Sequence, residues 1–194
     1  MTHRITIIQG HPDPARHHLC HALADAYRIG AESAGFEVRT IEVATLSFPL
    51  ICSKEDFEHG ERPGDIREAQ SMIRTSDHLV LVYPLWLGTL PALLKGFLEQ
   101  VFRYDFAFEP GPKGQFKKLL KGRSARIVVT MGMPALAYRL YFGAHGLKNL
   151  ERNILKFAGI SPVRESLFGM VENASDATRD RWLAQLRKLG TAGA

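Results

Sequence analysis

The chain has 194 residues, of which 45% are hydrophobic and 23% charged, and its formal net charge at pH 7 is +5. This balance is ordinary for a soluble globular protein. It excludes intrinsically disordered, collagen-like and disulfide-rich chains. At about 100–200 residues per domain, the length predicts a single domain over residues 1–194.

Cysteine content and charge limit the compartment and the partners. The two cysteines, Cys20 and Cys52, cannot form a disulfide framework, so we expect a reducing cytoplasm. No stretch approaches the roughly 18 apolar residues of a membrane span, and the N-terminus lacks the features of a signal peptide. The basic residues are scattered among 20 acidic ones without an aromatic–basic motif. We therefore expect anionic small molecules rather than nucleic acid as partners.

Strand and helix patterns alternate along the chain. Residues 4–9 read as a buried strand, followed by a helix over 19–34, a strand over 37–43 and a helix over 65–75. A strong strand over 78–83 precedes a helix over 91–102, and a strand over 125–131 precedes a helix over 145–158. The chain closes with a strand over 163–168 and a helix over 175–189 whose N-cap is Ser175. Residues 46–64, with a helical turn over 54–58, and residues 103–123 are expected to be loops.

This alternation predicts an α/β fold with three layers, in which a parallel five-stranded sheet has helices on both faces. The number of strands and the length fit the flavodoxin-like strand order 2-1-3-4-5. Ligands of such sheets bind beyond the carboxyl ends of the strands, at the switch point between the first and third strands. Three loops are thereby brought together, over residues 10–18, 84–90 and 132–143.

The first of these loops leads into a helix, whose free backbone N–H groups form an anion site. Arg16, His17 and His18 add cationic or hydrogen-bonding groups there. The loop carries neither the Gly-x-Gly-x-x-Gly fingerprint nor a P-loop ending, which disfavours dinucleotide binding of the Rossmann type. Two alternatives stay open. In the first, Pro12 and Pro14 shape a turn that a local hydrogen bond of His11 fixes. In the second, His17, Cys20 and His21 bind a metal ion. Because no further ligand cluster is evident, we expect no metal.

The other two loops carry aromatic and hydrogen-bonding residues. Leu85, Trp86 and Leu87 directly follow the central strand, where exposed apolar groups indicate a surface for a planar ligand. The alternative is that Trp86 packs under the next helix. Tyr138 and His145 could together hydrogen-bond a ligand carbonyl or oxyanion if their loop folds over the same pocket. Taken singly, Tyr138 is more often structural and His145 a helix cap.

Three motifs in these loops resemble one family. They are Pro84-Leu85-Trp86-Leu87-Gly88-Thr89-Leu90-Pro91, Gly10-His11-Pro12 leading to His21-Ala22-Leu23, and Thr130-Met131-Gly132-Met133 leading to Tyr138 and His145-Gly146. Their order and spacing over the whole chain are similar to those of the flavodoxin-like NAD(P)H:quinone oxidoreductases, the DT-diaphorase group. The resemblance implies a flavin, FAD or FMN, that takes hydride from NADPH or NADH and passes two electrons to a quinone-like acceptor in a ping-pong cycle.

The resemblance also implies roles for individual residues and a homodimer with the flavin at its interface. Tyr138 and His145 match the pair that hydrogen-bonds the flavin and balances its charge. Phe106 and Phe108 match the aromatic wall that the partner chain contributes to the substrate pocket. The residues implied to contact the flavin are His11, His17, His18, Leu19, Cys20, Pro84, Leu85, Trp86, Leu87, Gly88, Thr130, Met131, Gly132 and Met133.

Some positions depart from the family pattern. His17 and His18 stand where small hydroxyl residues are common, Cys20 where asparagine is frequent, and Met133 where glycine is common. These departures keep two further hypotheses open. One is a regulatory flavoprotein that docks on an ion-transport system, and the other is a scaffold that has lost its flavin.

Overall fold

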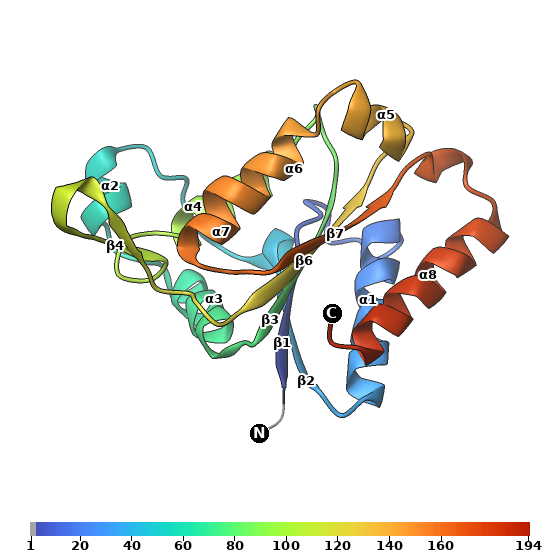
Figure 1. Ribbon diagram of the computed structural model, residues 1–194, viewed down its shortest axis with the longest axis horizontal. Coiled ribbons are helices and arrows are strands. Elements are labelled where there is room, and N and C mark those ends of the chain that lie inside the picture. Colours follow the sequence, from blue (N-terminus) through green and yellow to red (C-terminus); the bar gives the residue numbers. More distant parts are fainter. Residues whose placement is uncertain (1–2) are drawn as a thin grey trace.

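A computed structural model describes residues 3–194 of the chain. Its centre is a parallel five-stranded sheet in the order β2-β1-β3-β6-β7 (Figure 1). The strands are β1 (Arg4–Gln9), β2 (Glu37–Glu42), β3 (His78–Pro84), β6 (Ser124–Thr130) and β7 (Val163–Phe168). In sequence order this is 2-1-3-4-5, so the predicted flavodoxin-like topology is confirmed.

Helices cover both faces of the sheet, as predicted (Figure 1). One face carries α1 (Leu19–Ser33) and α8 (Asp176–Thr191). The other carries α3 (Gly64–Thr75), α4 (Ala92–Val101), α6 (His145–Asn149) and α7 (Lys156–Ala158). The short helix α2 (Lys54–His59) lies outside these layers.

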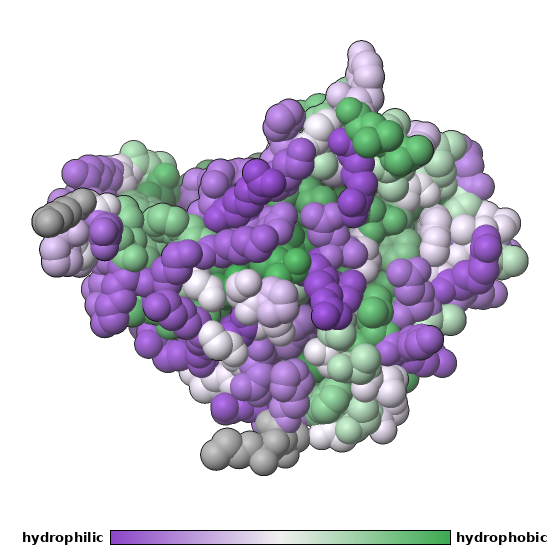
Figure 2. Space-filling model, viewed as in Figure 1, coloured by the Kyte–Doolittle hydropathy of each residue, from purple (hydrophilic) through white to green (hydrophobic). Residues whose placement is uncertain are grey.

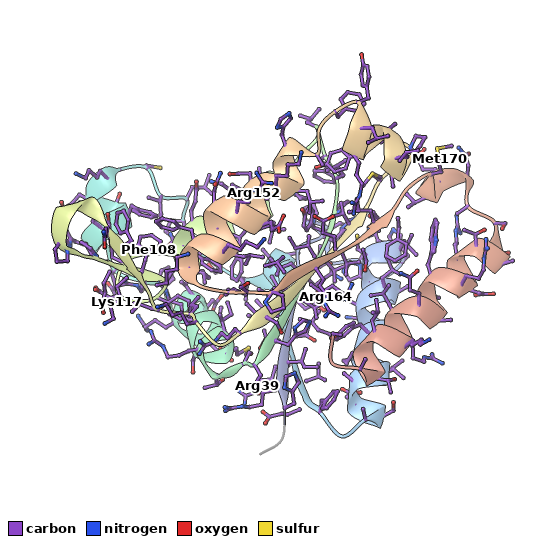
Figure 3. The ribbon with its side chains drawn as sticks, viewed as in Figure 1. Arg39, Phe108, Lys117, Arg152, Arg164 and Met170 are labelled. Atoms are coloured by element: carbon purple, nitrogen blue, oxygen red, sulfur yellow. The ribbon has the colours of Figure 1, made fainter. Side chains whose placement is uncertain are left out.

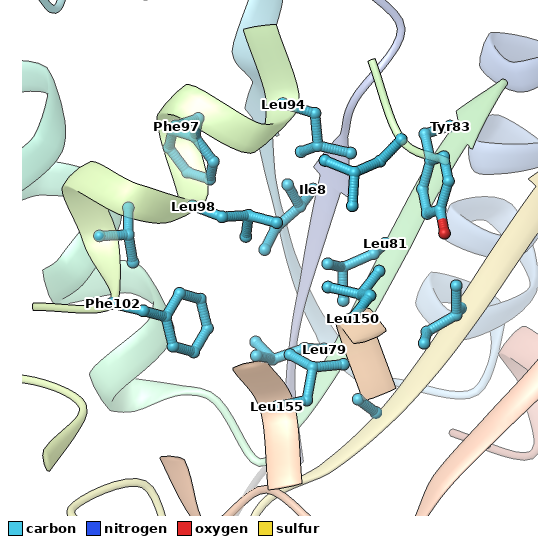
Figure 4. Packing of buried hydrophobic residues seen from close by; sticks show 14 of the residues in the cluster. Ile8, Leu79, Leu81, Tyr83, Leu94, Phe97, Leu98, Phe102, Leu150 and Leu155 are labelled. Atoms are coloured by element: carbon cyan, nitrogen blue, oxygen red, sulfur yellow. The ribbon is translucent and has the colours of Figure 1, made fainter. Parts of the chain in front are cut away.

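The central strand β3 explains why both faces are covered. Its first six residues are buried, as expected for a parallel sheet with helices on each side. Side chains alternate between the faces, so Leu79 and Leu81 pack on the α4 side together with Leu94, Leu98 and Leu150 (Figure 4). Val80 and Val82 point to the opposite face and pack with residues of α1 and α8.

Three regions contain structure that the sequence patterns did not predict. Residues 132–143, expected to be a loop, contain α5 (Ala135–Leu140). Residues 103–123 contain the antiparallel hairpin β4 (Phe108–Pro110) and β5 (Phe116–Lys118), with the 3₁₀ turn η2 (Pro112–Gly114) between them. The helix expected over 145–158 contains a π-helical segment, η3 (Leu150–Leu155). Elements of three to six residues are too short for a periodicity argument.

Two further 3₁₀ turns and the starts of two helices complete the fold. The 3₁₀ turns are η1 (Val43–Thr45) and η4 (Val171–Asn173). The Ser175 hydroxyl accepts a hydrogen bond from the Thr178 N–H, which confirms the predicted cap of α8. Helix α1, in contrast, begins after His18 without a side-chain cap. Within residues 3–194, no helix is long and apolar enough to cross a membrane.

Candidate functional site

Three segments meet at the carboxyl edge of the sheet and form what we call the cradle: the β1 loop (residues 10–18), the β3 turn (85–90) and the β6 loop (131–134). Backbone hydrogen bonds continue the sheet into them. The Gly10 N–H donates to the Val82 carbonyl at 2.7 Å, and the Leu85 N–H to the Thr130 carbonyl at 2.8 Å. The topology thus brings together the segments that the sequence predicted, at the switch point of the sheet.

The β3 turn is a tight, strained turn with an apolar tip. Trp86 and Thr89 exchange two backbone hydrogen bonds of 2.9 Å, and Leu87 and Gly88 between them have φ angles of 48° and 79°. Two positive φ angles define a type I′ turn, a conformation that is costly for leucine. Leu87 is 104% exposed and Trp86 51% exposed, so Trp86 does not pack under α4. An apolar side chain held out in a strained turn indicates a binding surface.

Tyr138 holds this turn in place from beneath. Its side chain is 1% exposed, and its hydroxyl donates to the Gly88 carbonyl at 3.2 Å and accepts from the Leu147 N–H at 3.2 Å. Burial raises the pKa of this phenol. The hydroxyl therefore supports the backbone of the β3 turn, which is a positioning role, and the direct ligand contact of Tyr138 stays a prediction.

His145 stays exposed at the first position of α6, where it can contact a ligand. The next residue, Gly146, brings α6 against the β3 turn. A Cβ atom at Gly146 would lie 2.5 Å from the Gly88 carbonyl oxygen, so only glycine fits without displacement. The structure therefore separates the predicted pair, with Tyr138 buried behind the turn and His145 accessible beside it.

The start of α1 offers unpaired hydrogen-bond donors. Within residues 3–194, the backbone N–H groups of His17, His18, Leu19 and Cys20 have no acceptor. The His17 side chain is exposed, and those of His18 and Leu19 are half-buried. Consecutive free N–H groups at the positive end of a helix suit a phosphate. The geometry is thus consistent with the anion site that the sequence predicted at the first loop.

Cys20 and His21 do not fit the alternative of a metal bound with His17. The Cys20 thiol is buried, lies 3.2 Å from the Thr130 hydroxyl and has its pKa raised by burial to about 11. His21 is 2% exposed, and its two ring nitrogens have no partner within the described part of the chain. Because neither side chain reaches His17 at the surface, that ligand set does not form.

His11 links the two ends of the cradle. Its ring stacks on the His18 ring at a centroid distance of 3.9 Å and meets the edge of Trp86 at 6.4 Å. The Asp13 N–H donates to the His11 Nδ1 at 3.1 Å. This is the local hydrogen bond of His11 that we predicted as an alternative to ligand binding, in which the loop is a fixed turn. Burial lowers the pKa of His11, so the neutral ring is favoured.

The β6 loop divides into a supporting half and an accessible half. Thr130 and Met131 are buried, and the Met131 N–H donates to the Phe168 carbonyl while its carbonyl accepts from Val171. The side chains of Thr130 and Met131 are buried beneath the exposed part of the loop, so direct flavin contacts of these side chains are not supported. Gly132 is exposed and Met133 half-buried, and neither backbone N–H has an acceptor among residues 3–194.

The cradle as a whole fits a planar ring bearing hydrogen-bond acceptors and a phosphate. The unpaired N–H groups of Leu87, Gly88, Gly132 and Met133 surround the apolar surface of Trp86 and Leu87. The phosphate donors of the α1 terminus adjoin the same surface through His11. Donors without acceptors beside exposed apolar groups match a flavin, whose ring edge accepts hydrogen bonds and whose chain carries phosphate.

Phe106 and Phe108, the two residues predicted to line the substrate pocket, lie in different environments. Phe108 lines a cavity of about 350 Å³ between α4 and the π-helical segment. Phe106 is 2% exposed and packs in the core, with the Arg74 guanidinium 5.0 Å from its ring centroid. Phe106 therefore does not line this cavity, and its place in the wall of a substrate pocket stays a prediction. Sequence reasoning missed other lining residues, namely Phe57, Lys95, Phe102, Asn149, Asn153 and Phe157.

The Phe108 end of this cavity lies away from the β6 loop of the cradle (Figure 3). Phe108, on β4, and Met170, whose N–H donates to the Met133 carbonyl in the cradle, lie at opposite ends of the molecule (Figure 3). The missed residues come from five separate elements, and no sequence motif joins them. The only local signal is the clustering of aromatic residues over 102–116, which the Gly-Pro content of that loop obscured.

The fold and the site define an α/β protein with a flavodoxin-like topology and a ligand cradle at the switch point. A family model described as flavodoxin-like fold matches residues 3–189, and the chain belongs to this family. The predicted family resemblance is confirmed at this level.

Relatives and a solved structure give the family its context. An uncharacterized NAD(P)H oxidoreductase of Haemophilus influenzae is 28% identical over 89% of this chain and 87% of its own length. The human ribosyldihydronicotinamide dehydrogenase [quinone] is 29% identical over 72% of this chain and 64% of its own. An FMN-dependent NADH-azoreductase from Bacillus anthracis, solved with FMN, covers 100% of both chains with a TM-score of 0.79 and 15% identity.

Proposed function

We propose that the protein is a flavin-dependent NAD(P)H:quinone oxidoreductase. The observation that carries the proposal is the cradle, in which unpaired backbone donors surround the exposed Trp86 and Leu87. The relatives named as NAD(P)H and quinone oxidoreductases, and the FMN held by a protein of the same fold, agree with it. When bound, the flavin supplies hydride transfer between a nicotinamide and a flat acceptor.

The chain contributes binding, orientation and electrostatics. The N–H groups of residues 17–20 hold the phosphate, and Trp86 and Leu87 contact the ring. The N–H groups of Gly132 and Met133 donate to the ring edge. His145, exposed beside the β3 turn, donates a hydrogen bond to the ligand and stabilises negative charge there.

A second cavity beside the α1 terminus supports a proposal on the form of the flavin. This cavity has a volume of about 380 Å³, and His17, His18 and Arg179 line it together with the apolar Leu19 and Val171. The Arg179 guanidinium and two imidazoles next to an apolar wall, with the Glu172 carboxylate also in the lining, suit the second phosphate and the adenosine of FAD, which FMN lacks. We therefore infer FAD, and the nucleotide released on denaturing the purified protein tests this.

The site is completed by a second copy of the chain. Leu87 is exposed in the cradle, and Phe108, at the aromatic end of the cavity, lies on the opposite side of the molecule from Met170, which hydrogen-bonds the β6 loop. In a homodimer, the acceptor binds between the cradle of one protomer and the aromatic cavity of its partner. Mixing inactive Trp86→Ala and Phe108→Ala variants should restore activity, because one of the two sites in the mixed dimer is intact.

The first experiment is a visible spectrum of the purified protein before and after anaerobic NADPH. Flavin absorption that NADPH bleaches and a quinone restores is the expected result. A colourless protein that no flavin reconstitutes would replace the proposal by the scaffold hypothesis. A reducible flavin without quinone turnover, in a protein that co-purifies with a transporter, would favour the regulatory flavoprotein.

A further inference from the structure

A cluster of metal-ligating side chains lies in the β1 loop. Asp13, His17 and His18 each offer one ligand atom, and these atoms all lie within 4.8 Å of one another. The two imidazole rings are side by side, with centroids 4.2 Å apart, and the His18 Nε2 lies 2.8 Å from an Asp13 carboxylate oxygen. The proposed flavin site uses the backbone N–H groups of His17 and His18 and a cavity that their side chains line, but it gives no role to Asp13 or to the convergence of its carboxylate with the two imidazoles.

The surroundings hold two of the three groups in place. The Ala15 N–H donates to the Asp13 Oδ1 at 2.9 Å, which leaves Oδ2 directed at His18. The His18 ring is fixed by its stack on His11. Supporting contacts of this kind orient the ligands of metal sites.

We propose that Asp13, His17 and His18 bind a divalent transition-metal ion of the zinc type. Zinc prefers imidazole and carboxylate ligands at about 2.0–2.2 Å, and three protein ligands leave one tetrahedral position open to water or an anion. Rotation of the exposed His17 side chain toward Asp13 and His18, which the contacts above hold in place, closes the present spacing. The ligand set differs from the one that the sequence suggested, since it uses Asp13 in place of Cys20 and His21.

The local charge permits a cation despite the positive end of α1. Arg16, the nearest guanidinium in the loop, is drawn away by Asp25 at 2.8 Å and Glu42 at 3.3 Å. The open coordination position also adjoins the cavity lined by His17, His18 and Arg179. An anion that enters this cavity therefore offsets the charge of both the helix and the ion.

Titration of the full chain with ZnCl₂ in a phosphate-free buffer, after chelation and dialysis, tests the site by calorimetry. We expect one ion per chain and an affinity that His17→Ala and His18→Ala each reduce by about ten-fold or more, since loss of even a supporting group has that effect in metal sites. His3→Ala is the matched control, because His3 also lies near a carboxylate, that of Asp77 at 3.8 Å, but the structure groups no second imidazole with it. Equal affinities in all these variants would overturn the proposal.

If the variants fail to fold, NMR of the unmutated protein tests the same site. Zinc should shift the imidazole nitrogen resonances of His17 and His18 and leave those of His3 and His59 unchanged. Shifts confined to other histidines, or none at a zinc excess, would also overturn the proposal. Neither readout depends on flavin or turnover, so the ion site and the proposed enzyme activity can fail separately.

Discussion

The β3 turn and the β1 loop form opposite sides of the cradle, but they are fixed in different ways. The β3 turn is held by contacts from distant parts of the chain, including the Tyr138 hydroxyl and the close approach of Gly146. The β1 loop is held mainly by its own side chains, through His11, Asp13 and His18. Changes behind the turn should therefore alter the stability of the whole protein, whereas changes in the loop should act locally.

The largest effect is expected from Gly146→Ala. The added Cβ would lie 2.5 Å from the Gly88 carbonyl oxygen and 2.7 Å from the Thr89 Cα, so backbone must move. We expect a loss of about 1–3 kcal/mol in the free energy of unfolding, measured by urea denaturation. Gly64→Ala is the control, since the nearest atom to its Cβ is a flexible Arg67 nitrogen at 4.0 Å. Equal losses in both variants would contradict the close contact.

Tyr138→Phe should cost somewhat less. The change leaves the Gly88 carbonyl and the Leu147 N–H without their partner, which is worth about 1–2 kcal/mol of unfolding free energy. If Tyr138 positions the turn, flavin affinity should fall together with stability. A variant that keeps full stability and affinity but loses turnover would support the direct role. Tyr141→Phe, at an exposed tyrosine, should change neither quantity.

Leu87→Asn should act in the opposite direction. Asparagine followed by glycine is the favoured pair for a type I′ turn, and it relieves the positive φ of 48° at leucine. We expect a gain of about 0.5–1 kcal/mol in unfolding free energy, with weaker flavin binding because an apolar contact is lost. Leu136→Asn, also exposed but on α5, should give no such gain. A destabilised Leu87→Asn variant would mean that the turn is not strained.

The smallest effect is expected in the β1 loop, from Asp13→Asn. Folding lowers the pKa of the Asp13 carboxyl group. The ionised carboxylate therefore stabilises the folded chain above the pKa that Asp13 has in the unfolded chain, and this stabilisation is lost as the pH falls through the pKa that Asp13 has in the folded chain. Between about pH 5 and pH 3, the unmutated protein should lose slightly more stability than the variant.

An exposed apolar surface on α5 follows the β6 loop of the cradle and differs in chemistry from the β1 loop. Hydrophobic residues gather over α5 (Figure 2), where Leu136, Leu140, Tyr141 and Phe142 are all exposed. The β1 loop has no comparable apolar surface, since His17, Arg16 and Asp13 are its exposed groups. The two sides of the cradle thus present different chemistry, one apolar and one charged.

The sequence by itself determined the topology and the three segments of the cradle. Strands such as 78–83 consist of consecutive apolar residues that can be buried only between two helical layers, and their order limits the connections. The free donors before α1 were also predictable, because His18 is a poor N-cap and the N–H groups of a first helical turn lack partners.

Only the tertiary structure decided which side of a segment faces the cradle. Tyr138 and His145 belong to one motif, yet the first is buried against Gly88 and the second is exposed. Phe106 and Phe108 are two residues apart, and only Phe108 lines the aromatic cavity. Local patterns identify residues that meet at an edge of the sheet, but the direction of a side chain depends on packing against elements distant in sequence. That packing is a property of the folded chain and is not encoded in any one motif.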